Sequence, residues 1–197
     1  MTPWQAPASF VDPHSRYAPG ADARQWKSRR SVLPCSGLEG SGSWRSFLHI
    51  YVDADACPVK QEVYKVARRL GLEVTLVSAS YIQPPPDDAI GAVAVGKGLD
   101  AADDWIAAQI QPGDICITAD IPLAARCLKA GAHAIGPRGK PFSEDSIGDA
   151  LATRELMRTL REAGLVHGGP APLSPRERSE FLDQLDQLIQ RVRRRGA

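Results

Sequence analysis

Two acidic residues follow an apolar segment in the first third of the chain. Asp53 and Asp55 come directly after Ile50 and Val52, and Pro58 follows them. The apolar run is typical of a buried strand, and proline suits a first helical turn, where its missing N–H needs no partner. Ligands of α/β proteins bind at the carboxyl ends of strands. Because neighbouring carboxylates repel each other, two of them at such a place indicate a site for a divalent cation.

Further acids recur at two later places in the chain. Asp100 and Asp103 open a predicted helix, and Asp120 follows the apolar segment 115–118. If the strands are parallel, these acids lie at the same edge of the sheet as Asp53. Carboxylates without a cluster of His or Cys favour Mg²⁺ or Mn²⁺ over Zn²⁺. Such ions can activate water for the hydrolysis of a phosphodiester bond.

Helix capping is the alternative explanation for each acid. Asp55, Asp100 and Asp120 each precede a predicted helix, and an aspartate N-cap stabilises a helix by about 1 kcal/mol. Asp103 lies in a predicted first turn, where the helix dipole favours a negative charge. Asp53 fits this explanation least well, because it is within the strand or just leaving it. One cap accounts for one acid, whereas here three segments bring acids to one edge.

Three basic residues are candidates for contact with a substrate phosphate. Lys97 ends a segment that nearly matches a phosphate-binding loop, but glycine stands where that loop needs Ser or Thr. Arg138 and Lys140 lie in a turn rich in Gly and Pro, where the backbone allows close approach. A solvated turn is the alternative for this pair. Cys57, beside the acids, is expected to be a small buried thiol rather than a nucleophile.

The elements that position these residues alternate between strand and helix from residue 47 onwards. This alternation predicts parallel crossovers, and hence a three-layer α/β domain with a mostly parallel sheet and flanking helices. The tail from residue 142 is expected to be helical, with a capping box at Ser174–Glu177. The expected strands are 48–52, 73–77, 92–95, 115–118 and 132–135, and the expected helices are 58–70, 100–110 and 120–129.

Composition and charge bound the possible functions. Residues 1–46 are rich in proline and contain a Gly/Ser run at 37–43, so we expect a disordered extension before a domain at 47–197. Residues 53–120 hold eleven acids and five bases, whereas residues 121–197 hold nine acids and thirteen bases. An acidic centre with basic flanks suits an anionic polymer such as RNA, although mixed surface charge is common.

The expected location is cytoplasmic, without a membrane partner. The four cysteines lack C-x-x-C spacing, and the sequence shows no secretory segment and no apolar stretch of membrane-spanning length.

Five motifs in order resemble the YaiI/YqxD family of bacterial proteins, and the resemblance extends from residue 47 to about 192. The motifs are IYVDADACPVK (50–60), GKGLDAADDWI (96–106), GDICITADIPLAARCLKAGA (113–132), GPRGKPF (136–142) and GGPAPLSPRERSEFLDQLDQLI (168–189). That family is similar, more remotely, to the PIN-like nucleases. In those proteins an acid after the first strand, an acid on a middle helix and a Thr-x-Asp after the fourth strand hold Mg²⁺ or Mn²⁺ for RNA cleavage.

The resemblance implies a PIN-like domain that acts as a metal-dependent ribonuclease. By its pattern Asp53 is the first ligand, Asp103 or Asp100 the second, and Asp120 the third. Thr118 would support them, and Asp55 would be an additional ligand or a base that orients water.

Two other functions stay open. The first is a non-catalytic module that binds nucleic acid or metal. The second is aspartyl phosphotransfer, because Asp-x-Asp after a first strand suits a phosphorylated nucleophile with its acid/base partner. Against the second, no lysine stands at a convincing strand end.

Overall fold

The computed structural model describes residues 48–55, 57–96, 98, 100–165 and 172–195. The chain divides into units 1–41 and 42–197, and every described residue belongs to the second unit. The extension expected at residues 1–46 therefore lies outside the described residues, as does Lys97.

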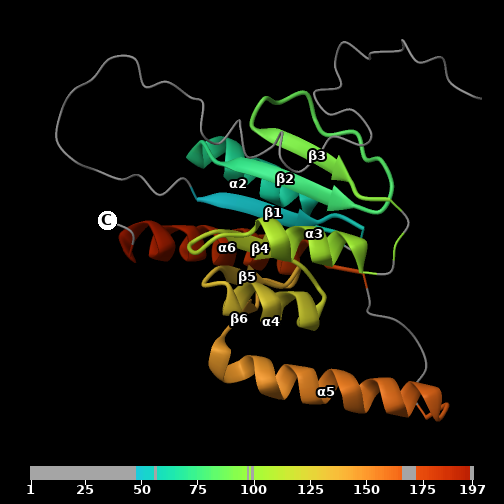
Figure 1. The fold of residues 1–197 in the computed structure, drawn as a ribbon. Coiled ribbons are helices and arrows are strands. Elements are labelled where there is room, and N and C mark those ends of the chain that lie inside the picture. The colour runs from blue at the N-terminus through green and yellow to red at the C-terminus, as the bar shows by residue number, and fades with distance from the viewer. Residues whose placement is uncertain (1–47, 56, 97, 99, 166–171, 196–197) are drawn as a thin grey trace, which may run out of the picture. The chain divides into compact units, whose positions relative to one another are not determined.

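The described strands form one sheet in the order β3-β2-β1-β4-β5-β6 (Figure 1). The strands from β1 to β5 are parallel, and β6 pairs antiparallel with β5. The mostly parallel α/β sheet predicted from the sequence is thus confirmed. The strands are β1 (His49–Asp53), β2 (Glu73–Ser78), β3 (Ile90–Ala94), β4 (Ile115–Ile117), β5 (His133–Ile135) and β6 (Pro141–Phe142).

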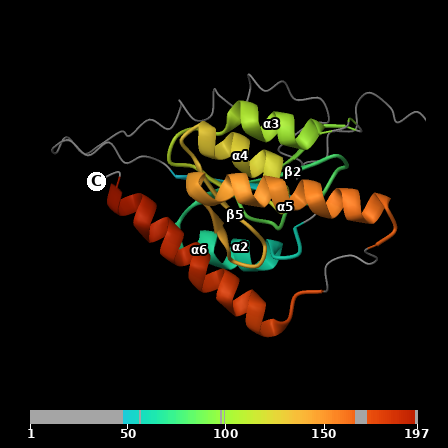
Figure 2. The ribbon, with the colours of Figure 1, turned by 90° about the horizontal axis from the view of Figure 1, so that it is seen from below.

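Helices cover both faces of the sheet (Figure 2). On one face α2 packs against α6, and on the other α3 packs against α4, which also contacts α5. Side chains of β1 alternate between these layers, since Ile50 and Val52 join the core with α2 and α6, whereas Tyr51 joins the core with α3 and α4. The helices are α2 (Lys60–Leu70), α3 (Ala101–Gln109), α4 (Ile121–Lys129), α5 (Glu144–Glu162) and α6 (Pro175–Arg195).

The order of the strands creates a topological switch between β1 and β4. From β1 the chain passes outward to β2 and β3, and it then returns to the other side of β1 to build β4 and β5. At such a point the loops leave the sheet in opposite directions, which opens a crevice at the carboxyl ends of the two strands. Asp53 ends β1 and Thr118 follows β4, so both lie at the carboxyl ends of these two neighbouring strands.

Element boundaries differ from the predicted ones in two informative places. The first helix begins at Lys60 rather than at Pro58, which lies in the preceding turn. The short strand β6 was not expected, because residues 136–141 resemble a turn. Its first residue is Pro141. Proline is tolerated there because β6 is the outermost strand, and the backbone positions on its outer side have no neighbouring strand to donate an N–H to.

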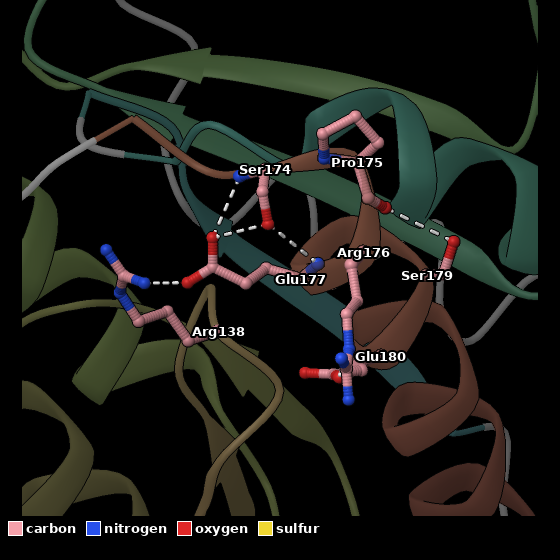
Figure 3. Close-up of polar contacts among 7 residues, drawn as sticks. All are labelled: Arg138, Ser174, Pro175, Arg176, Glu177, Ser179 and Glu180. Atoms are coloured by element: carbon pink, nitrogen blue, oxygen red, sulfur yellow. Dashed lines mark hydrogen bonds and ion pairs between the residues drawn. The ribbon is translucent and has the colours of Figure 1, made fainter.

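The capping box predicted at the start of α6 is confirmed (Figure 3). Glu177 N donates to Ser174 Oγ at 3.2 Å, and Ser174 N donates to Glu177 Oε2 at 2.8 Å.

The described helices include none that is long and apolar enough to cross a membrane.

Candidate active site

A threonine hydroxyl joins the ends of the two strands at the switch point. Thr118 Oγ1 donates to Asp53 Oδ2 at 3.0 Å and accepts from Asp120 N at 2.9 Å. Asp53 is 8% exposed and Thr118 is 1% exposed, so little water competes for these contacts. The hydroxyl therefore holds the Asp53 carboxylate in one position, and the support that Thr118 would give to a bound cation stays a prediction.

The acids at this edge act on one another electrostatically. Burial raises the pKa of Asp53, and the carboxylates of Asp55 and Asp120 raise it further, whereas the hydrogen bond from Thr118 lowers it. Burial also raises the pKa of Asp103 to about 6, with further contributions from Asp120, Asp53 and Asp100. Carboxylates from β1, α3 and the start of α4 are thus close enough to repel one another.

Asp120 is engaged on both of its oxygens. Its Oδ2 accepts from Leu123 N at 3.1 Å, so the predicted N-cap of α4 is confirmed. Its Oδ1 pairs with Arg154 at 3.3 Å. No group of three or more acidic, His or Cys side chains among the described residues is arranged to hold a metal ion. A cation that uses Asp120 has to draw this side chain away from its present partners.

Helix capping does not explain Asp55 or Asp100. Asp55 lies before the N-cap residue Val59, and its Oδ2 accepts from Ala79 N at 2.7 Å, which ties the loop after β1 to the end of β2. Asp100 precedes α3, but its φ of 58° is left-handed and its side chain makes no capping hydrogen bond. The predicted cap at Asp100 is therefore wrong, since a side-chain cap typically needs extended backbone at that residue.

Two cations at this edge were not predicted from the sequence. Lys60 Nζ donates to Ala54 O at 3.0 Å, between Asp53 and Asp55 in the chain. Its place in the first turn of α2 was the available signal, because helical side chains tilt toward the N-terminus. Arg154 comes from α5 and pairs with Asp120 34 positions earlier, and no local pattern predicts such a contact.

The basic turn between β5 and β6 packs against α6. Arg138 forms an ion pair with Glu177, whose other oxygen belongs to the capping box (Figure 3). This contact gives Arg138 a structural role, and its contact with a phosphate stays a prediction. Lys140 in the same turn is exposed, and a phosphate contact likewise stays a prediction for it.

The thiol beside the acids is buried, as expected. Burial raises the pKa of Cys57 to about 11, so the reactive thiolate is scarce at neutral pH.

Comparison with known proteins identifies the family. Residues 51–191 match the family described as "Uncharacterized BCR, YaiI/YqxD family". The chain belongs to the YaiI/YqxD family. Within the family match lie the acids of the site and both missed cations, Lys60 and Arg154.

Close relatives bear the printed name "UPF0178 protein". The relative from Rhodopseudomonas palustris strain TIE-1 is 63% identical over 148 residues, which cover 75% of this chain and 94% of the relative. The relative from Bradyrhizobium diazoefficiens is 57% identical over 146 residues, with 74% and 87% covered. The relative from Nitrobacter winogradskyi is 56% identical over 147 residues, with 75% and 94% covered. No solved structure gave a significant match.

Proposed function

We propose that this YaiI/YqxD family protein is a Mg²⁺- or Mn²⁺-dependent hydrolase that cleaves phosphodiester bonds of RNA. The observation that supports the proposal is the convergence of Asp53, Asp103 and Asp120 at the switch point, where Asp53 and Asp120 raise the pKa of Asp103 and Asp120 also raises that of Asp53. Acids that a fold forces together in this way gain most from a cation that offsets their repulsion.

The donor set fits a hard divalent cation. Mg²⁺ and Mn²⁺ take carboxylate oxygens and water as ligands. Asp53 and Asp103 would hold the ion, with Asp100 as the alternative on α3, and Asp120 would join after release from Arg154. When bound, the ion supplies activation of water and stabilisation of the leaving oxygen. Asp55, which is exposed at the same edge, would orient the water.

The cations at this edge complete the proposed site. Lys60 and Arg154 hold their charges beside the acids through the contacts described above. Each can turn from its present partner to a phosphate oxygen of the substrate. The present partners, Ala54 O for Lys60 and Asp120 Oδ1 for Arg154, both lie at the carboxyl ends of the strands, where the substrate would bind. Arginine suits this task, since its planar guanidinium donates two parallel hydrogen bonds to one phosphate.

The decisive experiment is cleavage of a labelled single-stranded RNA by the purified protein with Mn²⁺ or Mg²⁺. We expect cleavage by the natural protein and a loss of at least about 100-fold in rate for Asp53→Asn and Asp103→Asn. Asp104→Asn is the matched control, because Asp104 is exposed on the same helix and pairs with Arg126 at 2.8 Å. Its rate is expected to be unchanged.

Failure of the natural protein to cleave RNA or DNA with either ion would overturn the proposal. If the protein binds RNA in a salt-dependent way, and Asp53→Asn leaves that binding unchanged, the non-catalytic module is the correct description.

Aspartyl phosphotransfer is a second candidate, and the position of Lys60 favours it. A lysine beside the Asp-x-Asp loop can neutralise a phosphoryl group on Asp53, with Asp55 giving a proton to the leaving oxygen. The test is fluorine NMR of the protein with beryllofluoride and Mg²⁺. A bound signal that Asp53→Asn abolishes supports this candidate, and absence of a bound signal in the natural protein excludes it.

A further inference from the structure

A hollow of about 310 Å³ lies away from the acids at the carboxyl ends of the strands. Its lining includes His133, the first residue of β5, and Phe142 from β6. Because β1, β4 and β5 are parallel, the start of β5 lies at the amino ends of the strands and the end of β1 lies at their carboxyl ends. The hollow is therefore separate from the site around Asp53. Arg191 and Arg195 of α6 also line it, and in Figure 1 the C-terminal end of α6 lies on the side where β1 begins.

The charged groups that line this hollow are all basic. Arg191 and Arg195 are one helical turn apart, so they share a face of α6. In the described part of the chain neither guanidinium forms an ion pair, whereas Arg178 of the same helix pairs with Glu62 and Arg193 donates to Leu70 O. No described acid lines the hollow.

The electrostatics of His133 confirm that the positive charge is concentrated here. Burial lowers the pKa of His133, and Arg195 and Arg191 lower it further. Both guanidiniums are thus close enough to the imidazole to disfavour its protonation, and no acid offsets them.

The start of α5 adds a further anion-attracting group. Ser143 lines the hollow and is the N-cap of α5, a helix of 19 residues, so the positive end of the helix dipole faces this region. Glu144 and Asp145 in the first turn oppose this effect, but both are exposed and neither lines the hollow.

The remaining walls are apolar. Pro141 and Val192 are half-buried, and Pro141 lies opposite Ile135, which belongs with Leu188 to the core between α2 and α6. Phe142 packs instead against the core with α3 and α4. An apolar wall next to a pair of arginines suits a ligand that has a ring at one end and an anion at the other. The volume is at the small end of the range for ligand pockets, which limits the ligand to about one nucleotide.

We propose that this hollow binds a phosphate-bearing ligand of mononucleotide size, with Arg191 and Arg195 on the phosphate and the apolar surface of Pro141 and Val192 against the ring. Two guanidiniums present parallel donors that match phosphate oxygens. The proposal is independent of the hydrolase at the opposite edge, because it uses none of the same residues.

The test is isothermal titration calorimetry of the full chain with adenosine monophosphate and, separately, with inorganic phosphate. We expect the natural protein to bind the nucleotide more tightly than inorganic phosphate. Arg191→Ala and Arg195→Ala are expected to weaken nucleotide binding at least 10-fold. Arg194→Ala is the matched control, since Arg194 is exposed in the same helical turn and does not line the hollow.

A second measurement reports on the site directly. The ring signals of His133 in NMR spectra are expected to show a rise in its pKa when the nucleotide binds, because the phosphate offsets the two arginines. Asp103→Asn is expected to leave this response intact, which separates the proposal from the hydrolase.

Absence of nucleotide binding by the natural protein would overturn the proposal. An equal loss of affinity in Arg194→Ala would also overturn it, since the effect would then be one of general charge. Equal affinity for nucleotide and inorganic phosphate would exclude the contact between the ring and the apolar wall of Pro141 and Val192.

Discussion

Thr118 donates a hydrogen bond of 3.0 Å to Asp53, which lies 65 positions earlier in the chain. The bond connects the ends of the neighbouring strands β1 and β4. On one side of this pair the strand order continues to β2 and β3, and on the other side it continues to β5 and β6. The same hydroxyl accepts from Asp120 N, so one side chain fixes two of the acids proposed to hold a cation. The site is therefore built on the ends of central strands, which gives its acids a rigid support.

Replacement of Thr118 by valine is expected to lower the free energy of unfolding by about 1–3 kcal/mol. The change leaves the buried Asp53 carboxylate without this donor and Asp120 N without its acceptor. Urea denaturation at pH 7 measures the effect, and Thr118→Ser, which keeps the hydroxyl, is the control. A stability for Thr118→Val equal to that of the natural protein would show that the bond contributes nothing.

The pH dependence of stability is expected to report the repulsion among the acids. In the folded protein the pKa of Asp103 is raised to about 6, above its usual value near 4. Between about pH 4 and 6 the folded protein therefore binds more protons at this carboxyl than the unfolded chain does. Stability contributed by this group is therefore present at low pH and lost as the pH rises from about 4 to 6.

The Asp103→Asn variant is expected to lose this pH dependence. At pH 7 it should gain about 1 kcal/mol or less, because solvent screens a partly exposed carboxylate. Thermal melts between pH 4 and 7 measure the change. Asp104→Asn is the control, and it is expected to keep the slope of the natural protein.

Mn²⁺ is expected to stabilise the natural protein against unfolding. A ligand that binds only the folded state adds about 2.7 kcal/mol at 100 times its dissociation constant. Because Asp53 and Asp103 are the proposed ligands, Asp53→Asn should remove most of this gain. A melting temperature that does not respond to millimolar Mn²⁺ would contradict the proposed site.

Arg154→Gln is expected to tighten Mn²⁺ binding several-fold. The guanidinium pairs with Asp120 Oδ1 at 3.3 Å and so competes with the metal for that oxygen. Calorimetric titration with Mn²⁺ measures the affinity. Arg158→Gln is the matched control, since Arg158 lies one turn along α5 and pairs with Glu155 and Glu162. Weaker binding by Arg154→Gln would show that the arginine supports the site instead.

Gly139→Ala is expected to destabilise the fold more than Gly71→Ala. Both glycines have left-handed φ values, 78° and 62°, which cost an alanine about 1–2 kcal/mol. At Gly139 an added Cβ would also lie 3.1 Å from Phe181 Cα in α6, whereas nothing lies within 4 Å at Gly71. Urea denaturation of both variants compares the costs, and equal losses would contradict the close approach of α6.

Several features of this protein could be predicted because they depend on neighbouring residues in the chain. The apolar run before Asp53 predicted β1, and Ser174 with Glu177 predicted the start of α6. The alternation of short strands and helices predicted the parallel sheet, and with it the shared edge of the acids. Edge strand β6 was missed because two residues that begin with proline carry too little pattern.

What the sequence determined by itself is the order of the elements and the residue types at their ends. Only the tertiary structure decided that Arg154 pairs with Asp120, that Arg138 pairs with Glu177, and that Arg191 and Arg195 line one hollow with His133. The physical reason is that such contacts depend on how helices pack across the sheet. Packing brings together side chains far apart in the chain, and no local periodicity encodes those distances.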